Sequence, residues 1–147
     1  MHETLLPAQK GDVLELDELW SFVAAKRNEQ WIWVALCRRT RQVVAFYVGE
    51  HSAWSAGHLR LRIPGAYCCR ATRSDLWRAY AEVFPRRTHR SSGKGAGQTC
   101  HIERWNCTLR QRLGRFVRKS LSFSKCPRMH HAALKLFVHN YNLSLRS

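Results

Sequence analysis

Acidic residues are scarce in this chain of 147 residues. Ten Asp and Glu stand against 25 Lys and Arg, which gives a formal net charge of +15 at neutral pH. With so few acids the surface cannot be balanced in charge, and a polyanionic partner is expected. The basic residues are interleaved with Trp, Tyr and Phe along the whole chain. This distribution favours a folded basic surface over a disordered arm, and nucleic acid over a membrane.

Long apolar runs and metal-binding cysteine pairs are also missing. No stretch approaches the roughly 20 residues that a membrane-spanning helix needs, and the N-terminal residues lack a charged region followed by an apolar stretch. We therefore expect no membrane partner and a cytoplasmic location. The six cysteines include no C-x-x-C pair, which favours reduced thiols over disulfides or structural zinc. Cys100 and His101 beside Glu103 offer too few ligands for closed tetrahedral zinc. The glycines of residues 91–97 lack the spacing of a phosphate-binding P-loop.

The length fits a single domain that buries about two thirds of its unfolded surface. Residues 1–11 are short and polar, and we expect a leader without structure of its own, followed by one domain over residues 12–147. Alternating and β-branched residues predict three antiparallel strands with short connections over residues 13–22, 31–37 and 43–48, with Lys26–Glu29 as a polar turn. In the first strand Asp17 points away from the face of Leu14 and Leu16.

The second half of the chain alternates between helical and extended patterns. A helix is expected over residues 52–62, followed by a parallel strand at 67–72, a helix at 76–84 and a short strand at 86–90. Two further helices contain residues 102–116 and 128–142. The expected core positions of the first are Ile102, Trp105, Leu109, Leu113 and Phe116. Those of the second are Met129, Ala132, Ala133, Leu136, Phe137 and Tyr141, with His130, His131 and His139 on its polar face.

This order of elements predicts an α/β fold of the ribonuclease H-like type. Its mixed five-stranded sheet has three antiparallel strands plus parallel additions and is flanked by helices. In such a sheet the first strand and the end of the fourth strand are neighbours. Asp17 and Asp75 occupy these two places, and ligands collect beyond the carboxyl ends of such strands. Asp75 is equally suited to be the N-cap of the helix that follows it, and the two roles are compatible.

Glu103 is the only carboxylate after Glu82, although fourteen Lys and Arg follow Phe84. On a helix, a step of seven residues returns to within about 20° of the same direction, so Glu103 and Arg110 share a face. An exposed ion pair of Glu103 with Arg104 or Arg110 is the alternative, worth only about 0 to 1 kcal/mol. If Glu103 instead meets Asp17 and Asp75, three like charges require a cation, and hard oxygen ligands suit Mg²⁺ or Mn²⁺. Two such ions support phosphodiester displacement.

Four segments carry a resemblance to a known family: LDELWSFV, SDLWRAY, HIERWNCTLRQRLGRFVRKS and SFSKCPRMHHAALKLFVHNYN. Over nearly all of residues 12–142 the chain resembles the catalytic domain of DDE transposases of the insertion sequence 1 type. The resemblance implies that Asp17, Asp75 and Glu103 are the catalytic, metal-binding triad. It places Arg110 at the family's basic position, seven residues after the Glu. The chain departs from the family's common Asp-Gly-Trp, because Leu76 stands where glycine is usual.

The resemblance also implies partners. These are DNA, both element ends and target, a second copy of the chain in the active complex, and an upstream zinc-ribbon and helix-turn-helix portion that we expect this chain to lack. We expect association with the bacterial nucleoid. The candidate DNA-binding residues are the basic ones around Glu103 and in the preceding loop: Arg110, Arg104, Arg112, Arg115, Lys119 and Lys94.

The expected function is therefore divalent-metal-dependent DNA cleavage and strand transfer at insertion-sequence ends. Two alternatives remain open. A decayed or partial transposase would bind DNA through phosphates without turnover, or inhibit an intact transposase by pairing with it. A nuclease of the same fold would act on RNA:DNA hybrids, although the Arg-rich region around Glu103 favours the transposase.

Overall fold

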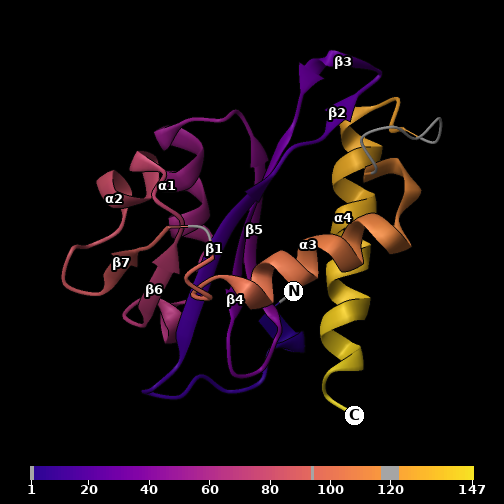
Figure 1. The fold of residues 1–147 in the computed structure, drawn as a ribbon. Helices are drawn as coiled ribbons and strands as arrows, with labels where there is room; N and C mark the ends of the chain where they lie inside the picture. Colours follow the sequence, from indigo (N-terminus) through magenta and orange to yellow (C-terminus); the bar gives the residue numbers. More distant parts are fainter. Residues whose placement is uncertain (1, 94, 117–122) are drawn as a thin grey trace.

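A five-stranded mixed sheet between two helical layers forms the body of the protein (Figure 1). The computed structural model describes residues 2–93, 95–116 and 123–147. The strands are β1 (Val13–Leu19), β2 (Phe22–Val23), β3 (Ala25–Glu29), β4 (Trp31–Cys37), β5 (Val43–Gly49), β6 (Ala71–Ser74) and β7 (His89–Ser91). The α-helices are α1 (Ala53–Arg62), α2 (Arg78–Val83), α3 (Cys100–Arg112) and α4 (Pro127–Ser144). Short 3-10 turns lie at His2–Thr4, Gly65–Tyr67 and Gly114–Phe116.

The sheet has the topology that the sequence predicts. Its strands lie in the order β5, β4, β1, β6 and β7. β4 pairs antiparallel with both β1 and β5, whereas β6 pairs parallel with β1 and with β7. The mixed five-stranded α/β sheet is therefore confirmed. Because β1 and β6 are parallel neighbours, their carboxyl ends meet at the same edge of the sheet.

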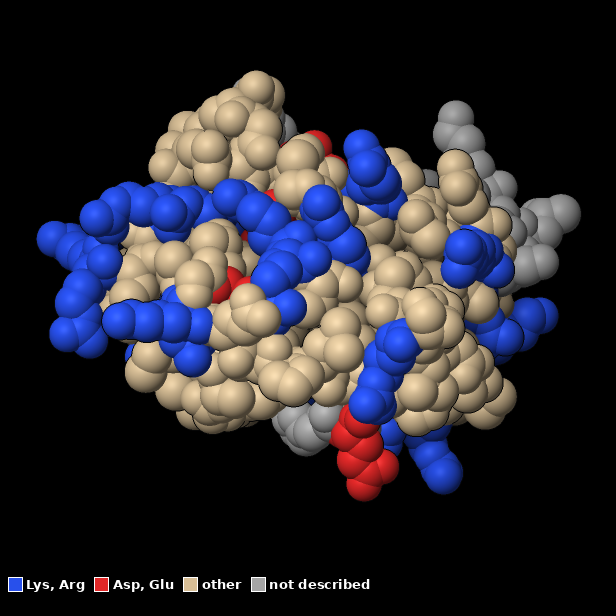
Figure 2. Space-filling view, turned by 90° about the horizontal axis from the view of Figure 1, so that it is seen from below, with Lys and Arg blue, Asp and Glu red and all other residues tan. Residues whose placement is uncertain are grey.

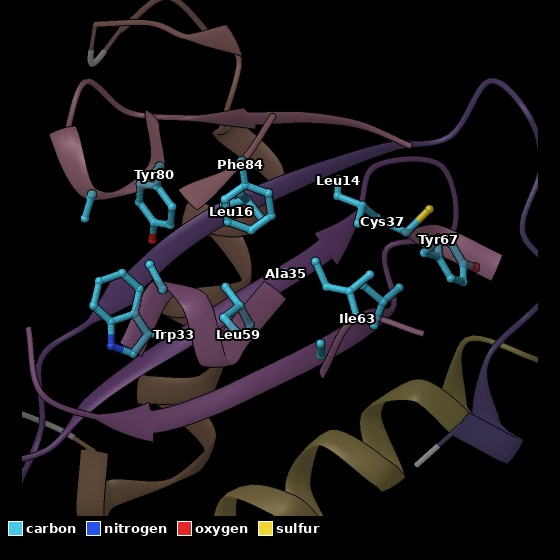
Figure 3. Packing of buried hydrophobic residues seen from close by; sticks show 14 residues of the cluster. Leu14, Leu16, Trp33, Ala35, Cys37, Leu59, Ile63, Tyr67, Tyr80 and Phe84 are labelled. Atoms are coloured by element: carbon cyan, nitrogen blue, oxygen red, sulfur yellow. The ribbon is translucent and has the colours of Figure 1, made fainter. Parts of the chain in front are cut away.

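Two hydrophobic cores lie on opposite faces of the sheet. Alternate residues of β4 supply both cores, since a central strand is buried on both sides. On one face Trp33 and Ala35 pack with Leu14, Leu16 and residues of α1 and α2 (Figure 3). On the other face the core contains Ile32, Val34, Leu36, Ile102, Trp105, Leu109, Leu134 and Val138, and is covered by α3 and α4.

The predicted core face of α3 is correct, and that of α4 is only partly correct, since Phe137 and Tyr141 pack partly buried against the core. Ile102, Trp105, Leu109 and Phe116 are buried, and Leu113 packs partly buried against them. On α4 the buried residues are His130, Leu134, Val138 and Asn142, while Met129 and Leu136 are exposed.

Polar partners explain why α4 turns a different face inward. The side chain of Asn142 accepts a hydrogen bond from the backbone N–H of Val43 and donates one to its carbonyl, both at 2.9 Å, so it satisfies the edge of β5. His130 lies 2.7 Å from the hydroxyl of Ser124 and 2.9 Å from that of Ser21. Hydrophobic spacing cannot detect polar groups that are buried because they find such partners.

Several predicted boundaries also differ from the structure. The first strand ends at Leu19, and the expected polar turn Lys26–Glu29 belongs to β3, which pairs with β2 in a separate two-stranded ribbon. β3 is mostly exposed, so it carries no apolar alternation for a sequence pattern to detect. The fourth and fifth strands lie at 71–74 and 89–91, later than the expected 67–72 and 86–90.

Residues before Asp12 pack on the sheet. Thr4 is buried, and the carbonyl of Leu6 accepts a hydrogen bond from the hydroxyl of Tyr67 at 2.9 Å. Gln42 bonds the backbone of both Thr4 and Leu6 at 2.8 Å. Among the helices of the described part of the chain, none is both long and apolar enough to cross a membrane.

Candidate active site

Asp17 and Asp75 meet at the edge where β1 and β6 end. The parallel register pairs Glu15 with Arg73, and each Asp lies two residues further along its strand direction. Asp17, Glu18 and Asp75 each offer one carboxylate oxygen, and these oxygens lie within 4.8 Å of one another. Two of the three acids that the sequence singles out are therefore brought together by strand pairing.

Glu103 approaches this pair from the first turn of α3. It is exposed, and its Oε1 accepts a hydrogen bond from the hydroxyl of Thr99 at 2.8 Å. Among the described residues the close trio contains Glu18 in place of Glu103. The charge of Glu103 nevertheless contributes to the raised pKa of Asp17, so the two carboxylates interact.

Glu15 attaches the start of α3 to β1. Its side chain is fully buried and accepts hydrogen bonds from the backbone N–H groups of His101 at 3.0 Å and Ile102 at 2.9 Å. Its Oε1 lies 2.9 Å from Nε of Arg38 and 2.6 Å from Nδ1 of His101. Thr99, at the N-cap position, makes no side-chain cap bond. Glu15 therefore performs the capping from another element and places the turn that carries Glu103 over β1.

Asn106 makes a second attachment between α3 and β1. Its Nδ2 donates a hydrogen bond of 2.7 Å to Oδ2 of Asp17. The residue is 8% exposed, and its Oδ1 is buried without a hydrogen-bond partner among the described residues. Asn106 lies one helical turn after Glu103, so the same helix face carries an acid for the site and an amide that orients another acid.

The site holds negative charge that nearby cations do not balance. Burial is the largest cause that raises the pKa of Asp17 to about 7, followed by the charge of Glu18 and then by Asp75 and Glu103. Within residues 2–93, 95–116 and 123–147, neither Asp17 nor Asp75 forms a salt bridge with Lys or Arg. Hard carboxylate oxygens in such a cluster match the ligands that Mg²⁺ and Mn²⁺ prefer. The donor set therefore fits a divalent cation.

Asp75 also closes the turn before α2. Its Oδ1 accepts a hydrogen bond of 2.9 Å from the backbone N–H of Trp77, and the helix begins at Arg78. Asp75 is therefore not the N-cap residue of α2, because Trp77 occupies that position; its side chain instead closes the turn two residues before it. Leu76, which replaces the family's usual glycine, is exposed, and its φ is not positive. This turn has no need of glycine's conformational freedom.

Glu18 is the acid that sequence reasoning missed. Its Oε2 accepts a hydrogen bond of 2.6 Å from the hydroxyl of Tyr80, and its Oε1 lies 3.3 Å from Nε2 of His51. His51 is stacked between Trp31 and Trp77, with ring centroids 4.1 and 4.0 Å away. Consecutive strand residues point to opposite faces, so alternation separates Glu18 from Asp17. The structure nevertheless brings both carboxylates close to Asp75.

The predicted basic residues differ in exposure. Arg104 and Arg112 are exposed, whereas Arg110 and Arg115 are half-buried. Lys94 and Lys119 lie outside the described residues.

The Cys100 and His101 pair is joined by Glu15, and one ligand atom of each lies within 4.8 Å of the others. The oxygens of Glu15 are already used by Arg38 and by the first N–H groups of α3. The cluster thus anchors the helix. The six cysteines are free, and Cys37 alone among them is buried.

The sheet order and the acids at its edge define the class of the protein. The structure is similar to the catalytic core domain of BIV integrase, with a TM-score of 0.50 and 18% sequence identity, over 69% of this chain and 68% of that one. The fold is therefore ribonuclease H-like, as expected from the sequence.

The family follows from sequence comparison. The model of the IS1 transposase family matches residues 13–143, and the chain belongs to this family. Among its relatives, the InsB protein of insertion element IS1 from Shigella flexneri is 36% identical over 129 residues, which are 88% of this chain and 93% of the relative. The iso-IS1n InsB protein of Shigella dysenteriae is 32% identical over 88% of this chain and 95% of its own length. The IS1 4 InsB protein of Escherichia coli K12 is 34% identical over 88% of this chain and 73% of its own length.

Proposed function

We propose that this chain is the catalytic domain of a transposase that cleaves DNA at insertion-sequence ends and joins the 3′ hydroxyl to target DNA with the help of divalent metal ions. The observation that carries the proposal is the meeting of Asp17 and Asp75 at one sheet edge, where neither forms a salt bridge with a Lys or Arg of the described residues. Family membership and the integrase-like fold support transposition and a DNA partner.

In this proposal Asp17, Asp75 and Glu103 hold one or two Mg²⁺ or Mn²⁺ ions. Bound there, the metal would make a water or hydroxyl a stronger nucleophile and stabilise the charge of the departing oxygen. The residues of the chain supply the position of the ligands. Asn106 holds Oδ2 of Asp17 by its hydrogen bond, and Glu15 holds the helix turn that carries Glu103. Arg110, half-buried on the same helix, would contact a phosphate of the DNA end.

Metal binding offers a direct test that does not require the element's own ends. We expect calorimetry with Mn²⁺ to show binding by the parent protein and at least about tenfold weaker binding by Asp75→Asn, because one charged oxygen ligand is lost. The matched control is Glu82→Gln, which removes an exposed acid that pairs with Arg78 on α2. Nicking of a supercoiled plasmid should require the metal and disappear in Asp75→Asn. Equal Mn²⁺ affinity in parent, Asp75→Asn and Glu82→Gln would disprove the site.

The main alternative is a DNA-binding module without turnover. The basic composition alone supports it, since binding to phosphates requires no metal. DNA binding with no Mn²⁺ binding and no nicking would favour this alternative.

A further inference from the structure

Three arginines lie across the sheet beside the acidic site, and no role follows for them from the triad. They are Arg38, directly after β4, Arg73 in β6 and Arg90 in β7. None of the three belongs to the basic set that the sequence pattern indicated around Glu103. We call these three residues the arginine strip.

Strand register places the strip on the same face of the sheet as the acids. Arg73 pairs with Glu15 of β1 on one side and with Arg90 of β7 on the other. Directly paired residues of parallel strands point to the same face, and Glu15 points toward α3. Arg73 and Arg90 therefore lie on the α3 side, as does Asp17, whose partner is Asn106 of α3. Their neighbours Thr72 and His89 bond each other on the opposite face.

The strip carries positive charge that is only partly neutralised. Arg38 forms an ion pair with Glu15, but neither Arg73 nor Arg90 forms one within the described ranges. Their side-chain hydrogen bonds go to backbone carbonyls, namely those of Thr72, Arg86 and His89.

The strip is close to the acids. Arg73 precedes Asp75 by two residues, so at about 3.3 Å per residue the two backbone positions are about 7 Å apart. Along the direction of β6, the row of paired arginines is thus followed by a carboxylate. On the face shown in Figure 2, Lys and Arg side chains form a broad band and Asp and Glu reach the surface at few points. Arginines without a carboxylate partner, gathered beside a metal-type site, are suited to a chain of phosphates.

We propose that the arginine strip is a binding track for the phosphate backbone of duplex DNA, on which the strand lies as it passes the Asp17 and Asp75 carboxylates. Arg73 and Arg90 make the phosphate contacts. Arg38 is paired with Glu15. It adds positive charge to the track and, through Glu15, also helps to anchor α3. This inference rests on the proposed function at one point only, which is the identification of DNA as the polyanion that the arginine strip binds.

The test is DNA binding without divalent metal. A labelled duplex of arbitrary sequence is titrated with protein in EDTA, with fluorescence anisotropy as the readout, at salt concentrations from about 50 to 200 mM. The variant is Arg73→Gln with Arg90→Gln. The matched control is Arg60→Gln with Arg62→Gln, which removes the same charge from two exposed arginines of α1, the helix that covers the opposite face. Arg73→Lys with Arg90→Lys retains the charge.

We expect the strip variant to bind about tenfold or more weakly, with a slope of log affinity against log salt smaller by about 1.8, or about 0.9 for each lost phosphate contact. The α1 control should stay within about twofold of the parent, and the lysine variant should recover most of the affinity. Circular dichroism and Mn²⁺ titration report folding and the metal site. If the strip variant fails to fold, the lysine variant is compared with the parent instead. Loss of DNA binding by the folded lysine variant, which retains the positive charge, would overturn the track.

Equal affinity and slope in the strip variant and the α1 control would also overturn the proposal. The outcome is independent of the catalytic proposal. If Asp75→Asn retains full Mn²⁺ affinity while the strip variant loses DNA, the track stands and the metal site fails. If Asp75→Asn loses Mn²⁺ while the strip variant binds DNA normally, the track fails and the metal site stands.

Discussion

At the scale of single residues, Asp17 is a candidate metal ligand whose surroundings disfavour the negative charge of its carboxylate. Its side chain faces α3 beside the acids Glu18, Asp75 and Glu103, and burial is the largest cause that raises its pKa to about 7 from an ordinary value of 3.8. The hydrogen bond from Asn106 offsets only part of the cost of burying the charge. Sites that bind metal commonly carry such a cost, because the ion removes it on binding.

The pKa of Asp17 predicts how stability depends on pH in the absence of metal. Between about pH 4 and pH 7 the folded protein holds a proton on Asp17 that the unfolded chain has released, so the free energy of unfolding falls as pH rises through this window. Asp17→Asn cannot titrate and should be more stable than the parent by about 1 to 3 kcal/mol above pH 7, with no advantage below about pH 4. Urea unfolding in EDTA at several pH values measures this difference. A difference that does not change with pH would contradict the prediction.

Arg110 gives a second prediction at this scale. If it positions a DNA end, Arg110→Ala should weaken end binding or strand joining, whereas Arg104→Ala, an exposed neighbour, should have a smaller effect. Arg110 is half-buried, so we expect a cost of about 1 kcal/mol in unfolding free energy, more than for an exposed position. Thermal melting and a joining assay separate the two effects. Joining at the parent rate would exclude the proposed role.

At the scale of elements, the site depends on how α3 is attached to β1. The helix carries Glu103 and Asn106, but its N-cap position makes no side-chain cap bond. Glu15 in β1 supplies that cap from across the fold, and Asn106 ties the next turn to Asp17. Three hydrogen bonds to two residues of one strand therefore set both the position and the rotation of the helix.

Removal of the Glu15 carboxylate should be costly. Glu15→Ala leaves the first N–H groups of α3 and the guanidinium of Arg38 without their buried partner, and we expect a loss of about 3 to 5 kcal/mol in unfolding free energy. Glu82→Ala, which breaks the exposed pair with Arg78, should cost no more than about 0.5 kcal/mol. Urea denaturation measures both. Similar losses in the two variants would show that the cap contributes little.

At the scale of the whole molecule, the positive charge and the acidic cluster have different distributions. A formal charge of +15 is distributed over the surface, whereas the Asp17, Glu18 and Asp75 carboxylates gather at one sheet edge. The field of such a protein attracts a polyanion from a distance and brings it to a small acidic site that a metal would neutralise.

This charge distribution predicts binding to DNA that is mostly electrostatic and weakly specific. Affinity for a duplex should fall by about a hundredfold or more between 50 and 200 mM salt, and a scrambled duplex should bind about as well as the original. Titrations at several salt concentrations with both duplexes measure this. Affinity that does not depend on salt, or a strong preference for one sequence, would reveal a reading element elsewhere in the chain.

Much of the fold follows from local patterns in the sequence. The strands over 31–37 and 43–48 and the core face of α3 were predictable, because β-branched runs and three-and-four spacing reflect burial directly. The α4 face was predictable only in part, because His130 and Asn142 are buried through polar partners on other elements. Glu15 and Asn106 were missed for the same reason, whereas Glu18 was missed because strand alternation directs it to the opposite face from Asp17.

The sequence by itself determined the basic composition, the order of the five sheet strands and the α-helices, and the places of Asp17 in the first strand and Asp75 after the fourth sheet strand, since each depends on residues close together in the chain. Only the tertiary structure decided which groups meet. Parallel pairing of β1 with β6 brings Asp75 to Asp17, and the Glu15 cap brings α3 over them. Hydrogen bonds and charges between distant segments act through space, and a linear pattern carries no record of those distances.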